Sequence, residues 1–354
     1  MDFKANTKDD LVRLLSLKGA ELEELYAHAA AIKREAVGNK VYFRGLLEYS
    51  NRCAKNCYYC GVRRGNREIA RYTMTDEEVL QAAALADEKQ FGSIVLQSGE
   101  RSDKAFTEKI AHLLQEIKHR FGGRLRVTLS MGERSEETFR LWRESGAHRY
   151  LLRIEASNPE LYGRIHPNDH LHSYERRLEA LELLRKTGYQ VGTGVMIGLP
   201  FQSLEDLAGD LLFIKNQNID MVGMGPYIEH HSTPLYKYRD QLMPSAERLE
   251  LSLKMVAILR IMMPNINMAA TTAMQTLHPQ GRERALKIGA NVIMPNLTPL
   301  KYREGYLLYE NKPNIHEETE VSLMNLKASI ENAGCTLATG EWGDSKHYLK
   351  RTGN

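Results

Sequence analysis

The sequence predicts an α/β protein, a (β/α)8 barrel of the TIM type with a helical extension before it. Two observations favour this class: strand-like and helix-like segments alternate along most of the chain, and polar or glycine-rich residues follow one strand after another. With 354 residues, the chain is long enough to form one such barrel. The alternation also fits an open parallel sheet, so it does not establish closure.

The segment before the barrel, Asp9–Val37, is predicted to be helical because leucine and isoleucine recur at helical spacing, with Gly19 between two helices. A terminal helix is expected over Glu317–Ala333, followed by a polar tail. The sequence therefore predicts three regions: an N-terminal helical extension (1–38), a barrel (39–310), and a C-terminal helix with a tail that closes the barrel (311–354).

The barrel strands are predicted from short apolar runs, and the helices from apolar residues recurring at a helical period. Thr75 and Glu78 form a capping box at one helix start, and Pro264 ends another helix. The predicted strands are Val41–Tyr49, Ser93–Gln97, Arg126–Ser130, Arg149–Glu155, Gln190–Ile197, Met221–Tyr227, Asn267–Thr272 and Asn291–Pro295. The predicted helices are Thr75–Gln90, Lys104–Phe121, Glu136–Ser145, Tyr174–Thr187, Leu204–Asn216, Ala246–Met263 and Gly281–Ile288.

The composition narrows the class of protein. The formal net charge is +3 and charges of both signs are scattered, which gives no sign of a nucleic-acid surface. No run approaches the ~20 apolar residues of a membrane helix, and the first residues lack the apolar core of a signal peptide. Four cysteines, three of them clustered, do not make a disulfide framework. We expect a monomer in the reducing cytoplasm, with no nucleic-acid partner and no membrane partner.

Three of the four cysteines, Cys53, Cys57 and Cys60, lie directly after the first predicted strand with the spacing C-x3-C-x2-C. Three thiolates can hold three corners of an iron–sulfur cluster, which usually takes four cysteines, and the fourth iron then stays open for chemistry. Such a cluster would require low oxygen. The alternatives are a zinc site completed by a histidine, or three unrelated core cysteines. No histidine lies between Glu48 and Arg71, which counts against zinc.

This loop, with Tyr59 just before its third cysteine, resembles the signature of the radical S-adenosylmethionine (SAM) superfamily. From about Asn39 to about Tyr309, the chain also resembles the HydE family of FeFe-hydrogenase maturases. The cysteine motif is specific only for the superfamily; the other runs select the family. Methylornithine synthase and biotin synthase match those later runs less well. The runs are R-G-L-L-E-Y-S-N-R-C, I-V-L-Q-S-G-E, R-Y-L-L-R-I-E, D-M-V-G-M-G-P, A-A-T-T-A-M and G-A-N-V-I-M-P-N.

The resemblance implies an enzyme with one 4Fe–4S cluster, held by three cysteines and open to SAM at the fourth iron. It implies reductive cleavage of SAM to a 5′-deoxyadenosyl radical. The radical would act on a small anionic iron complex with carbonyl, cyanide and cysteine ligands, in hydrogenase H-cluster assembly. An electron-donor protein and other maturases are the implied partners. An amino-acid mutase like methylornithine synthase is the alternative enzyme, and an iron–sulfur carrier without catalytic activity is the alternative of another class.

The resemblance also implies roles for individual residues in cofactor binding. Tyr59 would contact the SAM adenine, and Glu155 would accept hydrogen bonds from the ribose hydroxyls. Arg177 would pair with the SAM carboxylate, although within E-R-R-L-E it could instead be a solvated helix charge. The residues implied to line the methionine moiety of SAM are Ser98, Gly99 and Glu100.

The substrate side implied by the resemblance combines arginines, hydroxyls and a methionine. Arg149 and Arg153 could instead form structural salt bridges, for example with Glu155 or Glu133. Thr271, Thr272, Tyr306 and Tyr309 could serve only strand formation or packing. The implied substrate residues are Arg44, Gln97, Thr128, Arg149, Arg153, Met221, Thr271, Thr272, Tyr306 and Tyr309.

Two other groups of residues are assigned no chemistry. Cys335 stands alone near the C-terminus, so no second cluster is expected, and it is interpreted as an isolated apolar residue. The histidine-rich stretch from His166 to His172 is interpreted as a surface loop, and so is the pair His230 and His231.

Overall fold

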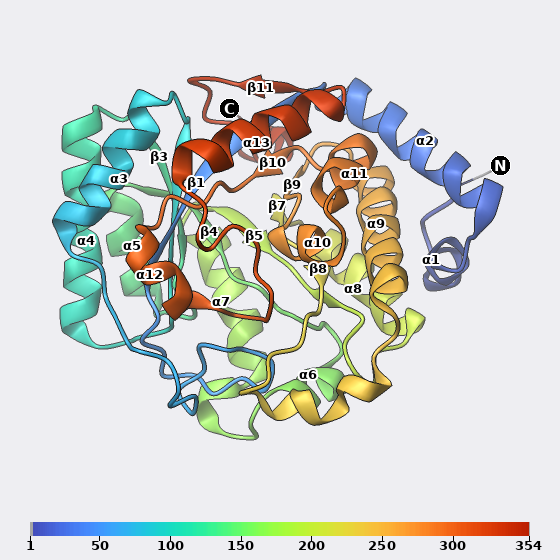
Figure 1. Cartoon of the computed structure of the whole chain (residues 1–354), viewed down its shortest axis with the longest axis horizontal. Coiled ribbons are helices and arrows are strands. Elements are labelled where there is room, and N and C mark those ends of the chain that lie inside the picture. Colours follow the sequence, from blue (N-terminus) through green and yellow to red (C-terminus); the bar gives the residue numbers. More distant parts are fainter. Residues whose placement is uncertain (1–2, 354) are drawn as a thin grey trace.

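The structure is a computed structural model that describes residues 3–353, and its core is a barrel of parallel strands (Figure 1). The strands pair in the order β10-β1-β2-β3-β4-β5-β7-β9. A parallel bridge between Ala269, directly after β9, and Val292 of β10 joins the two ends of this order, so the sheet closes. Closure confirms the barrel that the sequence predicts and rules out the open sheet. The strands are β1 (Lys40–Ser50), β2 (Ser93–Ser98), β3 (Arg126–Ser130), β4 (Ala147–Leu151), β5 (Gln190–Thr193), β7 (Met221–Val222), β9 (Asn267–Met268) and β10 (Val292–Ile293).

Three further strands lie outside this circle. β6 (Met196–Ile197) and β8 (Gly225–Pro226) pair in a small second sheet that follows β5 and β7 along the chain. β11 (Thr336–Ala338) pairs with the first residues of β1. Both features lie at the ends of barrel strands, where they extend or cover the barrel.

The helices surround the strands, as in Figure 1. Four predicted helices have the bounds found in the structure: α4, α5, α8 and α11. Their ends are set locally; the side chains of Asp103, Ser135 and Ser203, for example, cap the first turns of α4, α5 and α8. The helices are α1 (Lys8–Leu15), α2 (Gly19–Ala36), α3 (Asp76–Glu88), α4 (Lys104–Phe121), α5 (Glu136–Ser145), α6 (Pro159–Ile165), η1 (His170–His172), α7 (Tyr174–Lys186), α8 (Leu204–Asn216), η2 (Pro234–Gln241), α9 (Ser245–Met262), α10 (Thr272–Leu277), α11 (Gly281–Ile288), α12 (Leu300–Arg303), η3 (Glu304–Tyr306), α13 (Thr319–Asn332) and α14 (Lys346–Thr352).

Several predicted strands are wrong in their extent. The predicted strands Gln190–Ile197 and Met221–Tyr227 are each divided in two, as β5 with β6 and β7 with β8, and β10 is shorter than the predicted Asn291–Pro295. β4 covers Ala147–Leu151 rather than Arg149–Glu155, and β9 ends at Met268 rather than at Thr272. Thr272 instead begins the helix α10. A threonine fits a strand and a helix start equally well, so the residue type alone could not separate the two.

The segments at the two ends of the chain pack on the barrel. α1 packs on α8 and α9, and α2 packs on α9 and α11. After β11, the segment 341–345 runs across the amino-terminal ends of the strands. There Arg149 donates hydrogen bonds to the carbonyl of Trp342 and to the carboxylate of Asp344, both at 2.5 Å. We call residues 341–345 the floor segment, because they cover the barrel end opposite the cysteine loop.

No helix within residues 3–353 is both long and apolar enough to cross a membrane.

Candidate active site

The cysteine loop leaves β1 at the carboxyl ends of the strands, where barrel enzymes place their chemistry. Neighbouring loops hold it in place. The N–H of Ala54 donates to the carbonyl of Glu100 at 2.8 Å, and the N–H of Glu100 points at the sulfur of Cys53 at 3.3 Å. Arg71 donates to four backbone carbonyls in the same loop, at 2.6–2.9 Å. The loop is therefore ordered by its surroundings before any cofactor is considered.

The three thiols lie close enough together to influence one another's ionisation. Burial, with the neighbouring Cys53 as the next cause, raises the pKa of Cys57 to about 12. Burial also raises the pKa values of Cys53 and Cys60, and Cys60 lies beside the other two thiols. Without a metal these sulfurs stay protonated at neutral pH, whereas iron ions would stabilise the thiolates. The donor set therefore fits a metal cluster.

Two histidines that contact the loop are not available to complete a zinc site. His172 accepts the N–H of Asn56 on Nε2 at 2.9 Å and contacts Asp169 through Nδ1 at 2.6 Å. His166 contacts the hydroxyl of Tyr59 through Nε2 and the carbonyl of Tyr162 through Nδ1. Within residues 3–353, no three His, Cys, Asp or Glu side chains are grouped to hold a single ion. The arrangement suits a cluster, in which each thiolate binds a different iron.

The surface-loop interpretation is wrong for three of these histidines. His166 and His172 are buried and support the cysteine loop, and His230 is buried against Gly61. Only His170 and His231 fit the expectation of exposure. These histidines are buried through long-range contacts, which the polar composition of their segments does not reveal.

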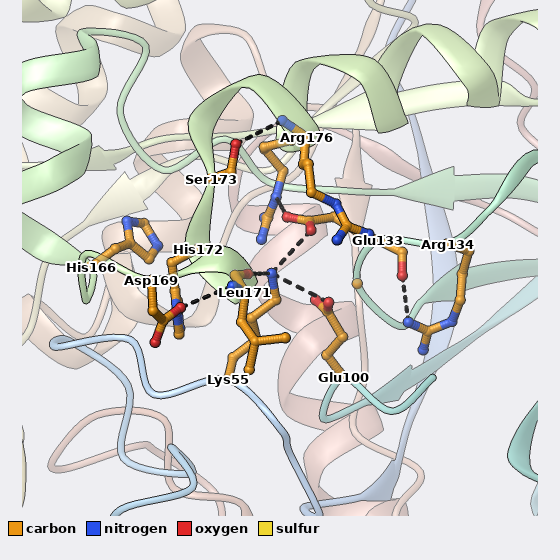
Figure 2. Close-up of polar contacts among 12 residues, drawn as sticks. Lys55, Glu100, Glu133, Arg134, His166, Asp169, Leu171, His172, Ser173 and Arg176 are labelled. Atoms are coloured by element: carbon orange, nitrogen blue, oxygen red, sulfur yellow. Dashed lines mark hydrogen bonds and ion pairs between the residues drawn. The ribbon is translucent and has the colours of Figure 1, made fainter. Parts of the chain in front are cut away.

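Beside the cysteine loop lies a buried network of four charges, shown in part in Figure 2. Lys55 Nζ contacts Glu133 at 3.0 Å and Glu100 at 3.3 Å, and donates to the carbonyl of Leu171. Arg177 Nε donates to the other oxygen of Glu133 at 2.6 Å. Burial alone would raise the pKa of Glu133, but Arg177 and Lys55 more than offset this and hold it below its usual value. The network thus joins the cysteine loop to α7 through paired charges.

Arg177 is buried, so its interpretation as a solvated helix charge is wrong. Its Nη1 also donates to the carbonyl of Arg153 at 2.6 Å. Among the residues that the structure describes, Nη2 has no hydrogen-bond partner. The guanidinium is therefore oriented by the protein and retains a donor for an incoming anion.

Glu155 and Arg153 form a two-pronged ion pair. The guanidinium of Arg153 donates to both carboxylate oxygens of Glu155, at 2.8–3.0 Å. Glu155 adopts a left-handed backbone conformation, with φ +67°, which is rare outside glycine, asparagine and aspartate. The salt bridge considered for Arg153 is thus present. If Glu155 contacts a ribose, the same carboxylate has to bind both the ribose hydroxyls and Arg153.

Tyr59 and the residues expected to line the methionine moiety surround the cysteines. Tyr59 lies edge-on to His166, with ring centroids 5.3 Å apart. The N–H of Gly99 donates to the carbonyl of Ser50 at 2.8 Å, and a side chain at position 99 would collide with Arg52 and Cys53. Ser98 is buried next to them. The loop after β2 therefore packs directly against the cysteine loop.

The expected substrate residues divide into two groups. Arg44, Thr128 and Met221 line a cavity of about 30 Å³ inside the barrel, which has room for water but not for a drug-sized ligand. Arg149, fully buried, pairs with Asp344 of the floor segment. A salt bridge was one of the two roles considered for Arg149, but Asp344 replaces the suggested partners Glu155 and Glu133.

The second group lies toward the carboxyl ends of the strands. Tyr306 is buried, and its pKa is raised by burial and by neighbours that include Glu48, Cys60 and Cys53. Tyr309 has its pKa raised to about 12 by burial, with Arg282 and Arg153 among its neighbours. Thr272 accepts a hydrogen bond from Arg282, and Thr271 donates to the carbonyl of Met224 at 3.4 Å. Gln97 stands beside Glu48 and Ser130 in the strand register.

Several residues of this region could not be assigned a role from the sequence. The position of Lys55 between two cysteines of the motif indicates that it lies in the site. Its role, however, depends on partners far along the chain. The hydroxyl of Tyr162 is buried without a partner in the described chain, near Arg177 and Glu133. Glu48 and Lys312 form a buried ion pair over the barrel end, and no local pattern predicts it.

A closed parallel barrel with three thiols at the carboxyl end of its first strand defines the class of radical SAM enzymes, and residues 47–214 match the Radical SAM superfamily. The chain belongs to the HydE family of FeFe-hydrogenase maturases. It is 43% identical over 347 residues to the FeFe-hydrogenase maturase subunit HydE of Thermotoga maritima, covering 97% of this chain and 95% of that protein.

Two further relatives are more distant. The 3-methylornithine synthase of Methanosarcina acetivorans is 28% identical over 330 residues, covering 92% of this chain and 89% of that protein. The crystal structure of methylornithine synthase (PylB) superposes with a TM-score of 0.78 at 26% identity, covering 94% of each chain. The superfamily implies a 4Fe–4S cluster and SAM as cofactors.

Proposed function

We propose that this enzyme cleaves SAM reductively at a cluster held by Cys53, Cys57 and Cys60, and that it acts on an iron complex in H-cluster assembly. The complex would carry two carbonyls, one cyanide and a cysteine. The observation that supports the first part is the buried cysteine loop tied by Lys55 to Arg177 through Glu133. The second part is supported by the 43% identity to a HydE protein over nearly the whole chain.

When bound, a 4Fe–4S cluster supplies one electron that breaks the S–C5′ bond of SAM into methionine and a 5′-deoxyadenosyl radical. The residues of the chain have to bind SAM, orient it and shield the radical from water. Arg177 would receive the SAM carboxylate on its free Nη2, while Glu133 and the carbonyl of Arg153 hold the guanidinium in position. Because the network is already paired, binding a carboxylate would require little rearrangement of charges.

Other residues would complete the SAM pocket. Glu155 would accept the ribose hydroxyls, with Arg153 holding its carboxylate in one orientation. Tyr59 would lie against the adenine, and Ser98, Gly99 and Glu100 against the methionine part. Burial of these groups excludes water, which protects a reactive radical from side reactions.

The substrate would lie beneath the SAM pocket. Arg153, Thr271, Thr272, Tyr306 and Tyr309 would contact it near the cysteine loop. Thr128 and Met221 would line the deeper part, and Arg44, whose guanidinium is held by the floor segment, would contribute charge beside them without contacting the substrate directly. Arg149 would then act at a distance, through the floor segment. The arginine and hydroxyl groups among these residues suit an anionic complex by charge and hydrogen bonding.

The experiment is anaerobic reconstitution with iron and sulfide, followed by an assay for 5′-deoxyadenosine with and without the synthetic iron complex. We expect SAM cleavage coupled to turnover of the complex. The second candidate is an amino-acid mutase, favoured by the superposition on methylornithine synthase at a TM-score of 0.78. Turnover of lysine, with the iron complex ignored, would favour the mutase. Absence of SAM cleavage under both conditions would contradict both functions.

A further inference from the structure

The cysteine loop and the residues that follow it carry an unusual concentration of positive charge. Between Asn51 and Arg71 there are six lysines and arginines and one acidic residue, Glu68. Four of the arginines take no part, through their side chains, in the ion pairs and hydrogen bonds described above. These four, Arg52, Arg63, Arg64 and Arg67, we call the basic rim.

The basic rim is held against the cysteine loop by the backbone. The N–H of Arg63 donates to the carbonyl of Cys60 at 3.1 Å, and the N–H of Arg64 donates to the carbonyl of Lys55 at 2.8 Å. The N–H of Gly65 donates to the side chain of Asn56 at 3.0 Å. Burial lowers the pKa of Arg63, while the thiols of Cys57 and Cys60 act in the opposite direction, which places this guanidinium near the cysteines. The rim thus follows the cluster site closely.

The four rim arginines lack ionic partners. Within residues 3–353, none of them forms a salt bridge, and Nε of Arg63 is buried without an acceptor. The nearby Glu68 is engaged by Ser232 and His231 instead. Surface cations elsewhere are often paired, as Arg140 is with Glu136 at 2.7 Å. Exposed Arg52, Arg64 and Arg67 therefore present uncompensated charge at the edge of the cluster site.

We propose that the basic rim is the docking surface for an acidic electron-transfer protein that carries a flavin or an iron–sulfur centre. This inference rests on the proposed function, because each SAM cleavage consumes one electron. In the transfer, the reduced donor loses one electron and the cluster gains it, and no atom or proton needs to cross. None of the residues proposed to bind SAM belongs to the basic rim, and Arg52, Arg64 and Arg67 are exposed, so the rim is free to contact a partner. A positive rim attracts and orients an acidic partner.

The test compares two routes for the same electron. In the double variant Arg64→Glu/Arg67→Glu, 5′-deoxyadenosine formation is measured with dithionite and with reduced flavodoxin or ferredoxin. The matched control is Lys118→Glu/Lys327→Glu, which makes the same charge change at exposed helix positions outside the cysteine loop. Iron content and thermal unfolding of each variant check that the cluster and the fold are intact.

We expect both variants to match the wild type with dithionite. With the protein donors, the rim variant should need at least about tenfold more donor than the wild type for half-maximal rate at low salt. This difference in donor requirement should become smaller as the salt concentration is raised. Equal donor dependence in wild type and rim variant would overturn the proposal. An equal increase in the donor requirement of the control variant would also overturn it. So would a direct titration in which neither flavodoxin nor ferredoxin binds the wild type. Failure of the wild type with dithionite would instead contradict the proposed function.

Discussion

Both ends of the barrel contain buried cations, but the two ends use them differently. At the end with the cysteine loop, Lys55 and Arg177 face two carboxylates, and Arg177 keeps one donor free. At the opposite end, Arg44 and Arg149 bind carbonyls of the floor segment, and Arg149 also pairs with Asp344. A buried arginine inside a barrel is therefore not by itself a sign of a substrate site; its partners decide whether it binds ligand or closes the fold.

The largest effect is expected from Cys57→Ser. The change removes one thiolate from the proposed cluster, so 5′-deoxyadenosine formation should fall to background. Cys335→Ser is the matched control, because Cys335 lies beside Lys33 and not in the loop, and it should retain full SAM cleavage. Iron analysis should give about four irons per chain in wild type and control. About eight irons, or SAM cleavage by Cys57→Ser, would contradict the single-cluster assignment.

The second-largest effect is expected from Arg149→Ala, at the barrel end covered by the floor segment. Removing a fully buried guanidinium leaves Asp344 without its salt bridge and should cost about 3–5 kcal/mol in the free energy of unfolding. SAM affinity of the folded protein should not change. Denaturant unfolding and SAM titration are the measurements, with the surface variant Arg140→Ala expected to cost less than about 1 kcal/mol. If Arg149→Ala kept its stability but lost turnover of the iron complex, the contrast between the two ends would fail.

Arg177→Lys should weaken SAM binding by about ten- to a hundredfold, or roughly 1.5–3 kcal/mol. Lysine keeps the charge, but its three donors share one nitrogen, so it loses the planar fork by which arginine reaches Glu133, the carbonyl of Arg153 and SAM from separate nitrogens. The neighbouring exposed Arg176→Lys is the control and should bind SAM as the wild type does. An unchanged SAM dissociation constant in Arg177→Lys would remove the carboxylate contact from the proposal.

At the barrel end covered by the floor segment, His148 should make the free energy of unfolding depend on pH. Burial, with Arg126 and Arg149 as further causes, lowers the pKa of His148 to about 3. Below a pH of about 6.5 the unfolded chain binds a proton that the folded chain does not, so stability falls as the pH decreases from about 6.5 toward the folded-state pKa of about 3. At pH 5.5 the loss should be about 1 kcal/mol relative to pH 7. Unfolding of His148→Gln should lack this contribution; an identical pH dependence would contradict it.

The smallest effect is expected from Thr272→Ala. Loss of one neutral hydrogen bond should lower turnover of the iron complex by about 0.5–1.5 kcal/mol, up to roughly tenfold, and leave uncoupled SAM cleavage near wild type. Thr187→Ala, at the far end of α7, serves as the control. Arg153→Ala is a less clean test, because Arg153 also holds Glu155 of the SAM pocket. Normal processing of the complex by Thr272→Ala would move the substrate site away from α10.

The sequence predicts well whatever is decided locally. Helix α4 has its predicted bounds, since Asp103 caps its first turn and Gly122 follows its last residue in a left-handed conformation. The cysteine loop is equally visible, because its three ligands lie within eight residues of one another. Such features depend on neighbours in the chain, which the sequence displays directly.

Features that depend on distant contacts could not be predicted in the same way. Nothing near Arg149 indicates that its partner is Asp344, nearly two hundred residues later. His172 stands in a polar segment, and only the fold brings it to the backbone of Asn56. Lys55 shows the intermediate case, since its place in the motif was visible but the carboxylates of Glu100 and Glu133 were not.

The pairing of β11 with β1 has a consequence for how the enzyme is made. Lys40 lies beside Thr336, so most of the chain must leave the ribosome before the start of the first strand has this neighbour and before the floor segment is in place. A pairing between such distant residues also slows folding, because the long stretch of chain between them must be closed first. A nascent chain thus carries its cysteine loop on a barrel that is still open at one end, and loading of iron and sulfur into a finished scaffold must follow translation.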